Sequence, residues 1–119
     1  MAGVYFISDL RARATFAPDK LTKVDCFRSG RLFTGLNCLA RGQSQKVHTH
    51  DSMDKFYLVL SGKARIVVGE EKQELGVGGI AWAPAGTPHG IEVTLEDSVI
   101  LVTMSPPPRG EEGRGKREG

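Results

Sequence analysis

Turn-forming residues interrupt the middle of this chain roughly every eight to twelve residues, and this spacing restricts the fold more than any other feature. Gly30, Gly42, Gly62, Gly69 and Gly78 mark such turns. The segments between them are short and apolar, and several alternate apolar and polar residues with the period of two that is typical of β-strands. We therefore predict an all-β fold, an antiparallel sandwich or barrel of about ten short strands. The main strands are expected at residues 21–28, 32–40, 46–50, 56–60, 63–68, 72–75, 80–83, 88–94 and 99–103.

The length of 119 residues favours a single domain with flanking segments. Residues 1–20 are expected to form an N-terminal arm, with a possible edge strand at 4–7 and a turn of helix at 8–14. Residues 21–105 would form the barrel. Residues 106–119 contain a proline run followed by glycine and charged residues, so we predict a disordered, charged tail.

Composition narrows the possible partners and the compartment. The net charge is only +2, from 16 Lys and Arg against 14 Asp and Glu, and no clustered basic face predicts a nucleic-acid partner. No apolar run approaches the roughly 20 residues that cross a bilayer, and residues 1–5 do not resemble a secretory signal. We therefore expect no membrane partner and a cytoplasmic location. Cys26 and Cys38 lie in strand-like segments and are interpreted as free thiols, with a disulfide or zinc pair as the alternative.

The chain has three histidines, and all of them lie in two short motifs. Side chains at positions i and i+2 of a strand lie on the same face, about 7 Å apart at Cα, so His48 and His50 can converge on one ion. Pro84 ends a strand, and Gly86 permits a tight turn that can bring His89 across from the pair. Three neutral imidazoles leave coordination positions open, as in catalytic metal sites. The alternative is two surface histidines with His89 unrelated to them.

These motifs resemble the two conserved motifs of the cupin superfamily. Gly42, five residues, His48-Thr49-His50, a linker and Gly62 are similar to the first motif. Gly78, five residues and then the segment 84–89, which ends in the third histidine, are similar to the second. The resemblance covers nearly all of residues 21–103.

The resemblance implies a double-stranded β-helix, a small jelly-roll barrel. It also implies one divalent transition metal ion near one mouth of the barrel, held by His48, His50 and His89. Iron, manganese, nickel, zinc and copper are not distinguished by such a ligand set.

One position of the first motif departs from the family pattern, and Val93 stands where the second motif of the family ends in asparagine. The first motif of the family has a glutamate three or four residues after its second histidine, and the spacing back from Gly62 puts Lys55 there, next to Asp54. A protonated lysine cannot ligate a metal and repels a cation. The site could therefore be three histidines with water, with Asp54 bridged through water. Asp54 could instead act as a fourth ligand, or the metal could be lost.

Four large residues are expected on strands that border the barrel interior: Phe33, Met53, Tyr57 and Trp82. Core packing is the simplest role for each of them. Tyr57 and Trp82 are the strongest pocket candidates, because each has a polar tip that needs a partner when buried. Lys55 or Tyr57 could supply a proton in catalysis.

The resemblance leads to a metal-dependent enzyme, dioxygenase-like or with other chemistry on small oxygenated molecules. A non-catalytic sensor or binding protein for a small ligand is the alternative, and a barrel without metal is a third. An anionic substrate could contact Lys55, Arg28 and Arg41. For the two arginines, the alternative is that they are solvated surface charges without a role in binding. We also predict a homodimer, because the resemblance implies dimers and a barrel of this size has sheet edges that need cover.

Overall fold

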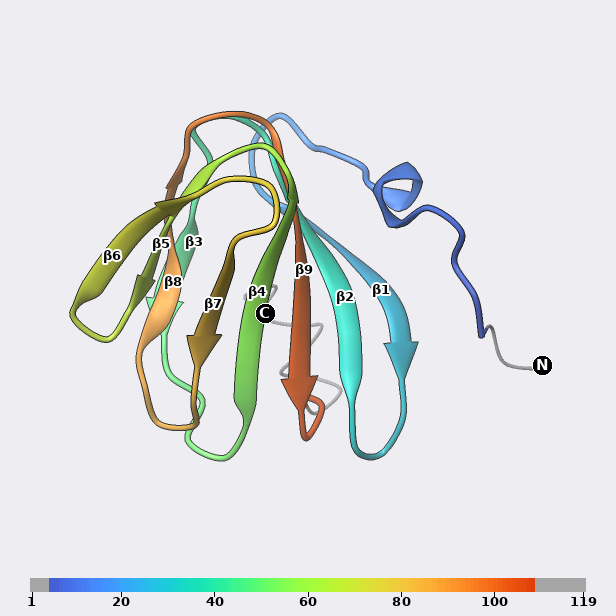
Figure 1. Cartoon of the computed structure of the whole chain (residues 1–119), viewed down its shortest axis with the longest axis vertical. Helices are drawn as coiled ribbons and strands as arrows, with labels where there is room; N and C mark the ends of the chain where they lie inside the picture. Colours follow the sequence, from blue (N-terminus) through green and yellow to red (C-terminus); the bar gives the residue numbers. More distant parts are fainter. Residues whose placement is uncertain (1–4, 109–119) are drawn as a thin grey trace.

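Two antiparallel β-sheets form the body of the protein, and the computed structural model describes residues 5–108 (Figure 1). Each sheet contains strands from both halves of the chain, so neighbouring strands are often distant in sequence. The turn spacing predicted a sandwich or barrel, and the arrangement is the double-stranded β-helix that the resemblance to cupins implied. In spatial order, the first sheet holds β1 (Thr22–Arg28), β2 (Phe33–Leu39), β9 (Ser98–Ser105), β4 (Asp54–Ser61) and β7 (Ile80–Ala83), and the second holds β3 (Gln45–His48), β8 (His89–Thr94), β5 (Ala64–Val68) and β6 (Glu71–Leu75).

The main core lies between the inner faces of the two sheets. Tyr57 and Val59 of β4 alternate with half-buried neighbours, as expected for a strand with one face inside. Ile100 lies beside them on β9, and Ile66 and Ile91 close the core from the second sheet. Burial of each such side chain contributes about 1.5–3 kcal/mol.

A smaller apolar cluster covers part of the outer face of the first sheet. Leu36, Cys38 and Val99 are buried there, and Leu10 from the N-terminal arm packs against them. The arm holds a short 3₁₀ helix (Leu10–Arg13), whose first turn is capped by Asp9 through a bond from the Arg11 N–H. Cys26 and Cys38 are both free thiols, as interpreted from the sequence.

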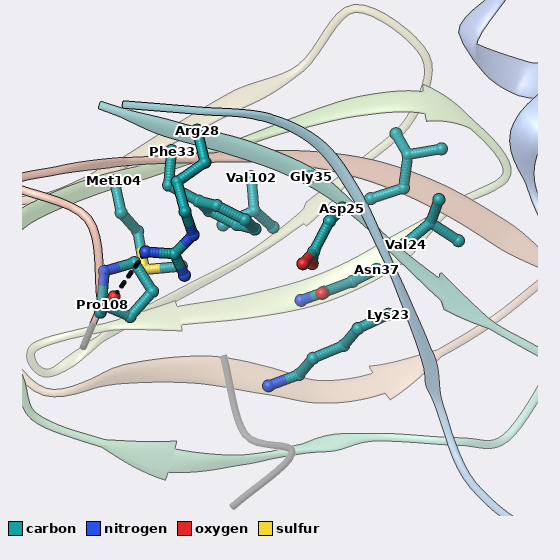
Figure 2. Close-up of a pocket in the computed structure, with 11 residues that line it drawn as sticks. Lys23, Val24, Asp25, Arg28, Phe33, Gly35, Asn37, Val102, Met104 and Pro108 are labelled. Carbon is teal, nitrogen blue, oxygen red and sulfur yellow. Dashed lines mark hydrogen bonds between the residues drawn. The ribbon is translucent and has the colours of Figure 1, made fainter. Parts of the chain in front are cut away.

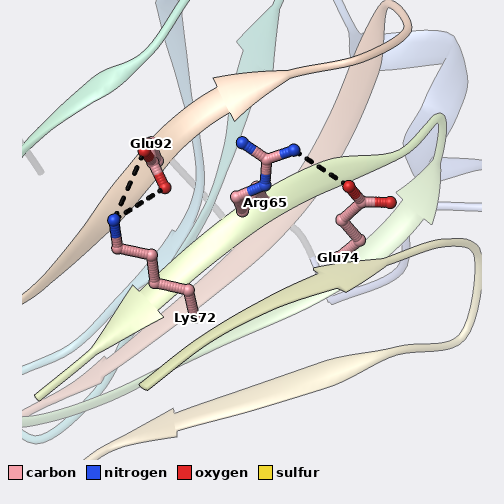
Figure 3. Close-up of polar contacts among 4 residues, drawn as sticks. All are labelled: Arg65, Lys72, Glu74 and Glu92. Atoms are coloured by element: carbon pink, nitrogen blue, oxygen red, sulfur yellow. Dashed lines mark hydrogen bonds and ion pairs between the residues drawn. The ribbon is translucent and has the colours of Figure 1, made fainter. Parts of the chain in front are cut away.

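The outer face of the second sheet is charged instead. Figure 3 shows Arg65 of β5 reaching Glu74 of β6, with a nitrogen–oxygen distance of 3.0 Å. Lys72 of β6 reaches Glu92 of β8 at 3.5 Å. These side chains are largely exposed, so this face is solvated, whereas the first sheet presents partly apolar surface outward.

The N-terminal expectation needs one correction. Residues 5–7 have no strand partner and are not part of a sheet, so the predicted edge strand at 4–7 is not formed over its described part. A strand needs a neighbour for its backbone hydrogen bonds, and an apolar run alone does not provide one. Residue 4, and residues 109–119 of the predicted tail, lie outside the described residues.

Candidate metal centre

His48 and His89 are direct cross-strand partners on β3 and β8. Their ring centroids lie 4.5 Å apart. His50 follows the end of β3, and its ring centroid lies 4.7 Å from that of His48 and 5.6 Å from that of His89. The first and third histidines therefore meet through strand pairing, while the second reaches them from a loop. This differs from the expected extended segment 46–50, in which His48 and His50 would share one face of a strand.

Backbone contacts hold the loop of His50 against the turn before His89. The Gly86 N–H donates to the His50 carbonyl oxygen at 2.9 Å. Gly86 has a φ of +83°, a left-handed conformation that glycine adopts readily. The Ala85 N–H donates to Asp54 Oδ1, also at 2.9 Å, so a side chain from the start of β4 supports the same turn.

Two hydrogen bonds orient the imidazoles. The Nδ1 atom of His48 lies 2.9 Å from the Lys46 carbonyl oxygen, and that of His89 lies 2.9 Å from the Thr87 carbonyl oxygen. Because a carbonyl oxygen only accepts, each Nδ1 carries the proton and donates it. The lone pair of each ring is then on Nε2, the usual arrangement for a metal-ligating histidine with a backbone partner.

The three side chains fit a single metal ion. One ligand nitrogen from each of His48, His50 and His89 lies within 4.8 Å of the other two. A tetrahedral ion with bonds of about 2.0–2.1 Å needs nitrogens roughly 3.3 Å apart, so small side-chain movements would complete the site. His89 is 1% exposed, and its Nε2 has no hydrogen-bond partner among the described residues. A buried polar atom of this kind is typical of a ligand position.

The local electrostatics keep His89 neutral. Burial, followed by the nearby charge of Lys55, lowers its pKa to about 4. The histidine is therefore deprotonated near neutral pH, as metal ligation requires.

Lys55, not Asp54, faces the barrel interior. Lys55 is 1% exposed, and its Nζ lies 4.8 Å from the centroid of the Tyr57 ring. Burial and the charge of Lys23 hold its pKa well below the usual range. Asp54 is exposed and accepts the bond from Ala85, and it does not join the histidine group. Among the described residues, the geometry thus matches a three-histidine set without a carboxylate.

Tyr57 lies on the inner face, with its ring centroid 6.0 Å from that of His89. Its hydroxyl donates to Gln45 Oε1 at 2.6 Å, and burial raises its pKa, so it is a hydrogen-bond donor more than an acid. Sequence reasoning did not single out Gln45. The available signal was its place just before the H-x-H motif, where a buried polar side chain needs a partner.

The remaining predicted site residues lie in different places. Met53 and Phe33 are buried in the core. Trp82 is 56% exposed and lines a surface groove, which corrects the expectation that it borders the interior. The reason is strand alternation, since its neighbour Ala83 takes the inward position. A pocket that opens to solvent is lined by residues 49–53, which include His50, together with Gly30, Pro106 and Pro107.

The two arginines that the sequence suggested as substrate contacts lie at opposite ends of β2. Arg28 stacks over the Phe33 ring, with 5.2 Å from the guanidinium carbon to the ring centroid, and its Nη1 donates to the Pro108 carbonyl oxygen at 2.9 Å. Arg41 is exposed at the opposite end of β2, where its N–H donates to Asp97.

Comparison with known protein families shows to which family the chain belongs. The model of the cupin domain matches residues 35–105, which contain both histidine motifs. The chain belongs to the cupin family. Among curated proteins, this cupin is similar to the uncharacterised protein SCO3923 of Streptomyces coelicolor. The two are 38% identical over 82 residues, which cover 67% of this chain and 75% of the relative.

Solved structures agree with this fold. TT1209 from Thermus thermophilus is 40% identical with a TM-score of 0.79, over 84% of this chain and 96% of its own. KdgF from Halomonas sp. is 25% identical with a TM-score of 0.76, over 89% and 96% of the respective chains. In addition, the described residues of this cupin contain no helix with the length and apolarity needed to cross a membrane.

Proposed function

We propose that this cupin is a metal-dependent enzyme acting on small oxygenated molecules, with His48, His50 and His89 holding one divalent transition metal ion. The observation that carries the proposal is the convergence of three imidazole nitrogens within 4.8 Å, one of which belongs to His50, a residue that lines a solvent-accessible pocket. Open coordination positions are typical of catalytic centres, whereas structural sites are closed by four protein ligands. We expect dioxygenase-like chemistry as the first type of reaction to test. We also expect the protein to act in the cytoplasm.

The metal would supply a Lewis acid or, as iron, a centre for oxygen chemistry. The surrounding side chains would position the substrate. Lys55 places its Nζ on the inner face, where its lowered pKa lets it hold or release a proton, and Tyr57 holds Gln45 in place through its hydroxyl. Met53 borders the access pocket and would exclude water from one side of it.

Metal analysis of protein prepared without a histidine tag tests the proposal. We expect a stoichiometric divalent metal in the wild-type protein and its loss in His89→Gln. Thr49→Ala is the matched control, because Thr49 is exposed between the two ligands of the first motif. Oxygen uptake with Fe(II) would then be measured on diketones, catechols and flavonoids. A metal content below one ion per chain that does not rise when metal ions are added would contradict the proposal.

A binding or sensor protein is the second candidate, and the buried Lys55 favours it. An amine on the inner face, where the family has a carboxylate, suits the holding of an anion when it is protonated. A small ligand that raises the melting temperature and is recovered unchanged after long incubation with the metal-loaded protein would support this function over catalysis.

A further inference from the structure

The side-chain amide of Gln45 is buried beside the candidate metal centre but does not belong to its ligand set. Gln45 begins β3, is 2% exposed and pairs with Ile91 of β8. The second residue pair of the same two strands joins His48 to His89, two residues away along β8. Cross-strand partners lie on the same face of a sheet, and alternate residues of a strand share a face at a spacing of about 7 Å. The Gln45 side chain therefore points into the barrel, one row from these two imidazoles.

Tyr57 fixes the orientation of this amide from the opposite sheet. Its hydroxyl oxygen lies 2.6 Å from Gln45 Oε1, and its ring centroid lies 6.0 Å from that of His89. Such a short contact is typical of O–H···O bonds, at about 2.7–2.8 Å, whereas N–H···O bonds are usually about 2.9–3.0 Å long. Burial raises the pKa of Tyr57, so the hydroxyl keeps its proton and donates it. The amide oxygen therefore faces Tyr57, and the NH₂ group faces away from it.

The NH₂ group of Gln45 has no acceptor among residues 5–108, although its nitrogen is buried. An amide nitrogen carries two N–H donors and accepts no hydrogen bond. Ile91 and Ile66 continue the same cross-strand row into the apolar core, where a methionine would fill the space of Gln45 without an unpaired donor. A buried donor without a protein partner, next to a candidate metal centre, indicates that its acceptor belongs to a molecule that binds there.

Asn37 provides a contrast within the same protein. Its Nδ2 is also buried without an acceptor in the described part of the chain, and the side chain is 3% exposed. Figure 2 shows Asn37 in a narrow cleft beside Lys23 and Asp25 of β1. The cleft offers about 20 Å³, enough for one water molecule, and its lining residues do not include any of the three histidines. Asn37 is therefore the reference for a buried amide away from the metal centre.

We propose that the Gln45 amide donates a hydrogen bond to an oxygen atom of the small molecule that binds at the three-histidine centre. The nitrogen only donates, so the ligand must present an acceptor, and bonds to an ionised acceptor such as a carboxylate are the strong ones. Because Tyr57 holds the amide in one orientation, little side-chain freedom is lost on binding. The substrates are then small molecules with a carbonyl or carboxylate group. This assignment names the substrate class of the proposed function and rests on it.

Titration of the Co²⁺-loaded full-length chain, followed through the visible spectrum of the metal, tests the role of Gln45. Acetate is the probe with a carboxylate oxygen, and bromide is the matched anion without one. We expect Gln45→Met to weaken acetate binding by about tenfold or more and to leave bromide binding unchanged. The double variant Gln45→Met/Tyr57→Phe removes both partners of the buried bond, so it leaves no unpaired hydroxyl in the core and should show the same difference. Asn37→Leu, a similar change in a buried amide, should leave both affinities unchanged.

Nitrogen-15 NMR of the side-chain amides gives a second measurement, which depends neither on catalysis nor on a bound metal. The Gln45 NH₂ signals are identified by their absence in Gln45→Met. We expect acetate to shift them in the Zn²⁺-loaded protein and also in the metal-free chain, because the donor is present in both forms. The Asn37 signals, identified in the same way from Asn37→Leu, should not respond.

Two results of the titration would overturn the inference. Unchanged acetate affinity in both Gln45 variants would mean that the amide binds an internal water molecule, and an equal loss of acetate and bromide affinity would mean that the substitution distorts the centre. Failure of the enzyme proposal looks different. If the protein takes up no metal but acetate shifts the Gln45 signals of the metal-free chain, the enzyme proposal fails and the role of Gln45 stands. If acetate leaves these signals unchanged, the inference fails whether or not metal binds.

Discussion

Lys55 is the residue at which this cupin departs most from the pattern of its motifs. Its side chain is buried beside Tyr57, in the place where the family has a metal-ligating glutamate. Its charge lowers the pKa of His89. A positive charge there opposes a cation held by the histidines, because like charges repel strongly when water is excluded. The three-histidine site should therefore bind metal less tightly than a site completed by a carboxylate.

We expect Lys55→Glu to raise the affinity for Zn²⁺ or Co²⁺ by about tenfold or more, since it removes a repulsion and adds a ligand oxygen. Competition titration against a metal indicator measures this change. Lys63→Glu is the control, because Lys63 is exposed and makes the same charge change on the surface. Equal affinity of Lys55→Glu and the wild-type protein would show that residue 55 does not face the ion.

His89 makes the stability of the metal-free protein depend on pH. Its folded-state pKa of about 4 lies below the usual 6.5, so the unfolded chain binds the proton more readily. The free energy of unfolding of the metal-free protein therefore has its full value above about pH 6.5. It falls by about 3 kcal/mol in total as the pH decreases through about 4. Urea unfolding between pH 4 and 7 measures it, and His89→Gln should flatten the difference. Parallel curves for the two proteins would contradict the assignment.

At the scale of elements, the turn between β7 and β8 carries His89 to the centre. Asp54 supports this turn through the Ala85 N–H at 2.9 Å, although it is not a ligand in this geometry. Asp54→Ala should cost about 1 kcal/mol and weaken metal binding through a looser turn. Asp54→Asn retains an acceptor oxygen and should retain most of the affinity. If Asp54→Asn loses the metal as completely as Asp54→Ala does, the carboxylate itself is a ligand.

Two glycines with similar φ angles should respond differently to substitution. Gly86 has a φ of +83° and open space where a Cβ would be added, so Gly86→Ala should cost only the backbone strain of about 1 kcal/mol. Gly62 has a φ of +86°, but a Cβ there would collide with the Asp97 carbonyl and with Ser98. Thermal unfolding should show a clearly larger loss for Gly62→Ala. Equal losses would mean that the β4–β5 turn relaxes around the added methyl group.

For the whole molecule, the two outer faces indicate how copies would associate. The second sheet carries charged pairs outward, whereas the first sheet places Trp82 beside Phe56 and Ile80 beside Leu58. Trp82 and Ile80 are 56% and 59% exposed, and β7 is an edge strand. Exposed apolar groups next to a free strand edge are typical of an interaction surface.

We propose that the first sheet forms the homodimer interface. Light scattering at micromolar concentration should give a dimer mass, and Trp82→Glu should shift it toward the monomer, because the charge would be buried in the interface. Glu74→Lys, on the outer face of the second sheet, should leave the dimer intact. A monomeric wild-type protein would contradict the proposal.

The amino-acid sequence by itself determined the fold class, the strand positions and the identity of the histidine cluster. These features depend on local chemistry: alternation sets which segments form strands, and glycine marks the turns between them. Gly42, Gly62 and Gly78 all have positive φ, as their turns required. The motif spacing placed His48 and His89 in one site because it reflects strand lengths that the barrel must keep.

The tertiary structure alone decided how side chains meet across strands that are distant in the chain. Sheet order and register determine which face of each strand is buried. For this reason the side chain of Trp82 points outward and that of Lys55 points inward, while Asp54 accepts a hydrogen bond from the turn before His89. The Tyr57–Gln45 bond and the burial of the Asn37 amide away from any described acceptor arise from the same non-local packing. Local sequence carries no record of these contacts, since each joins residues that only the closed barrel brings together.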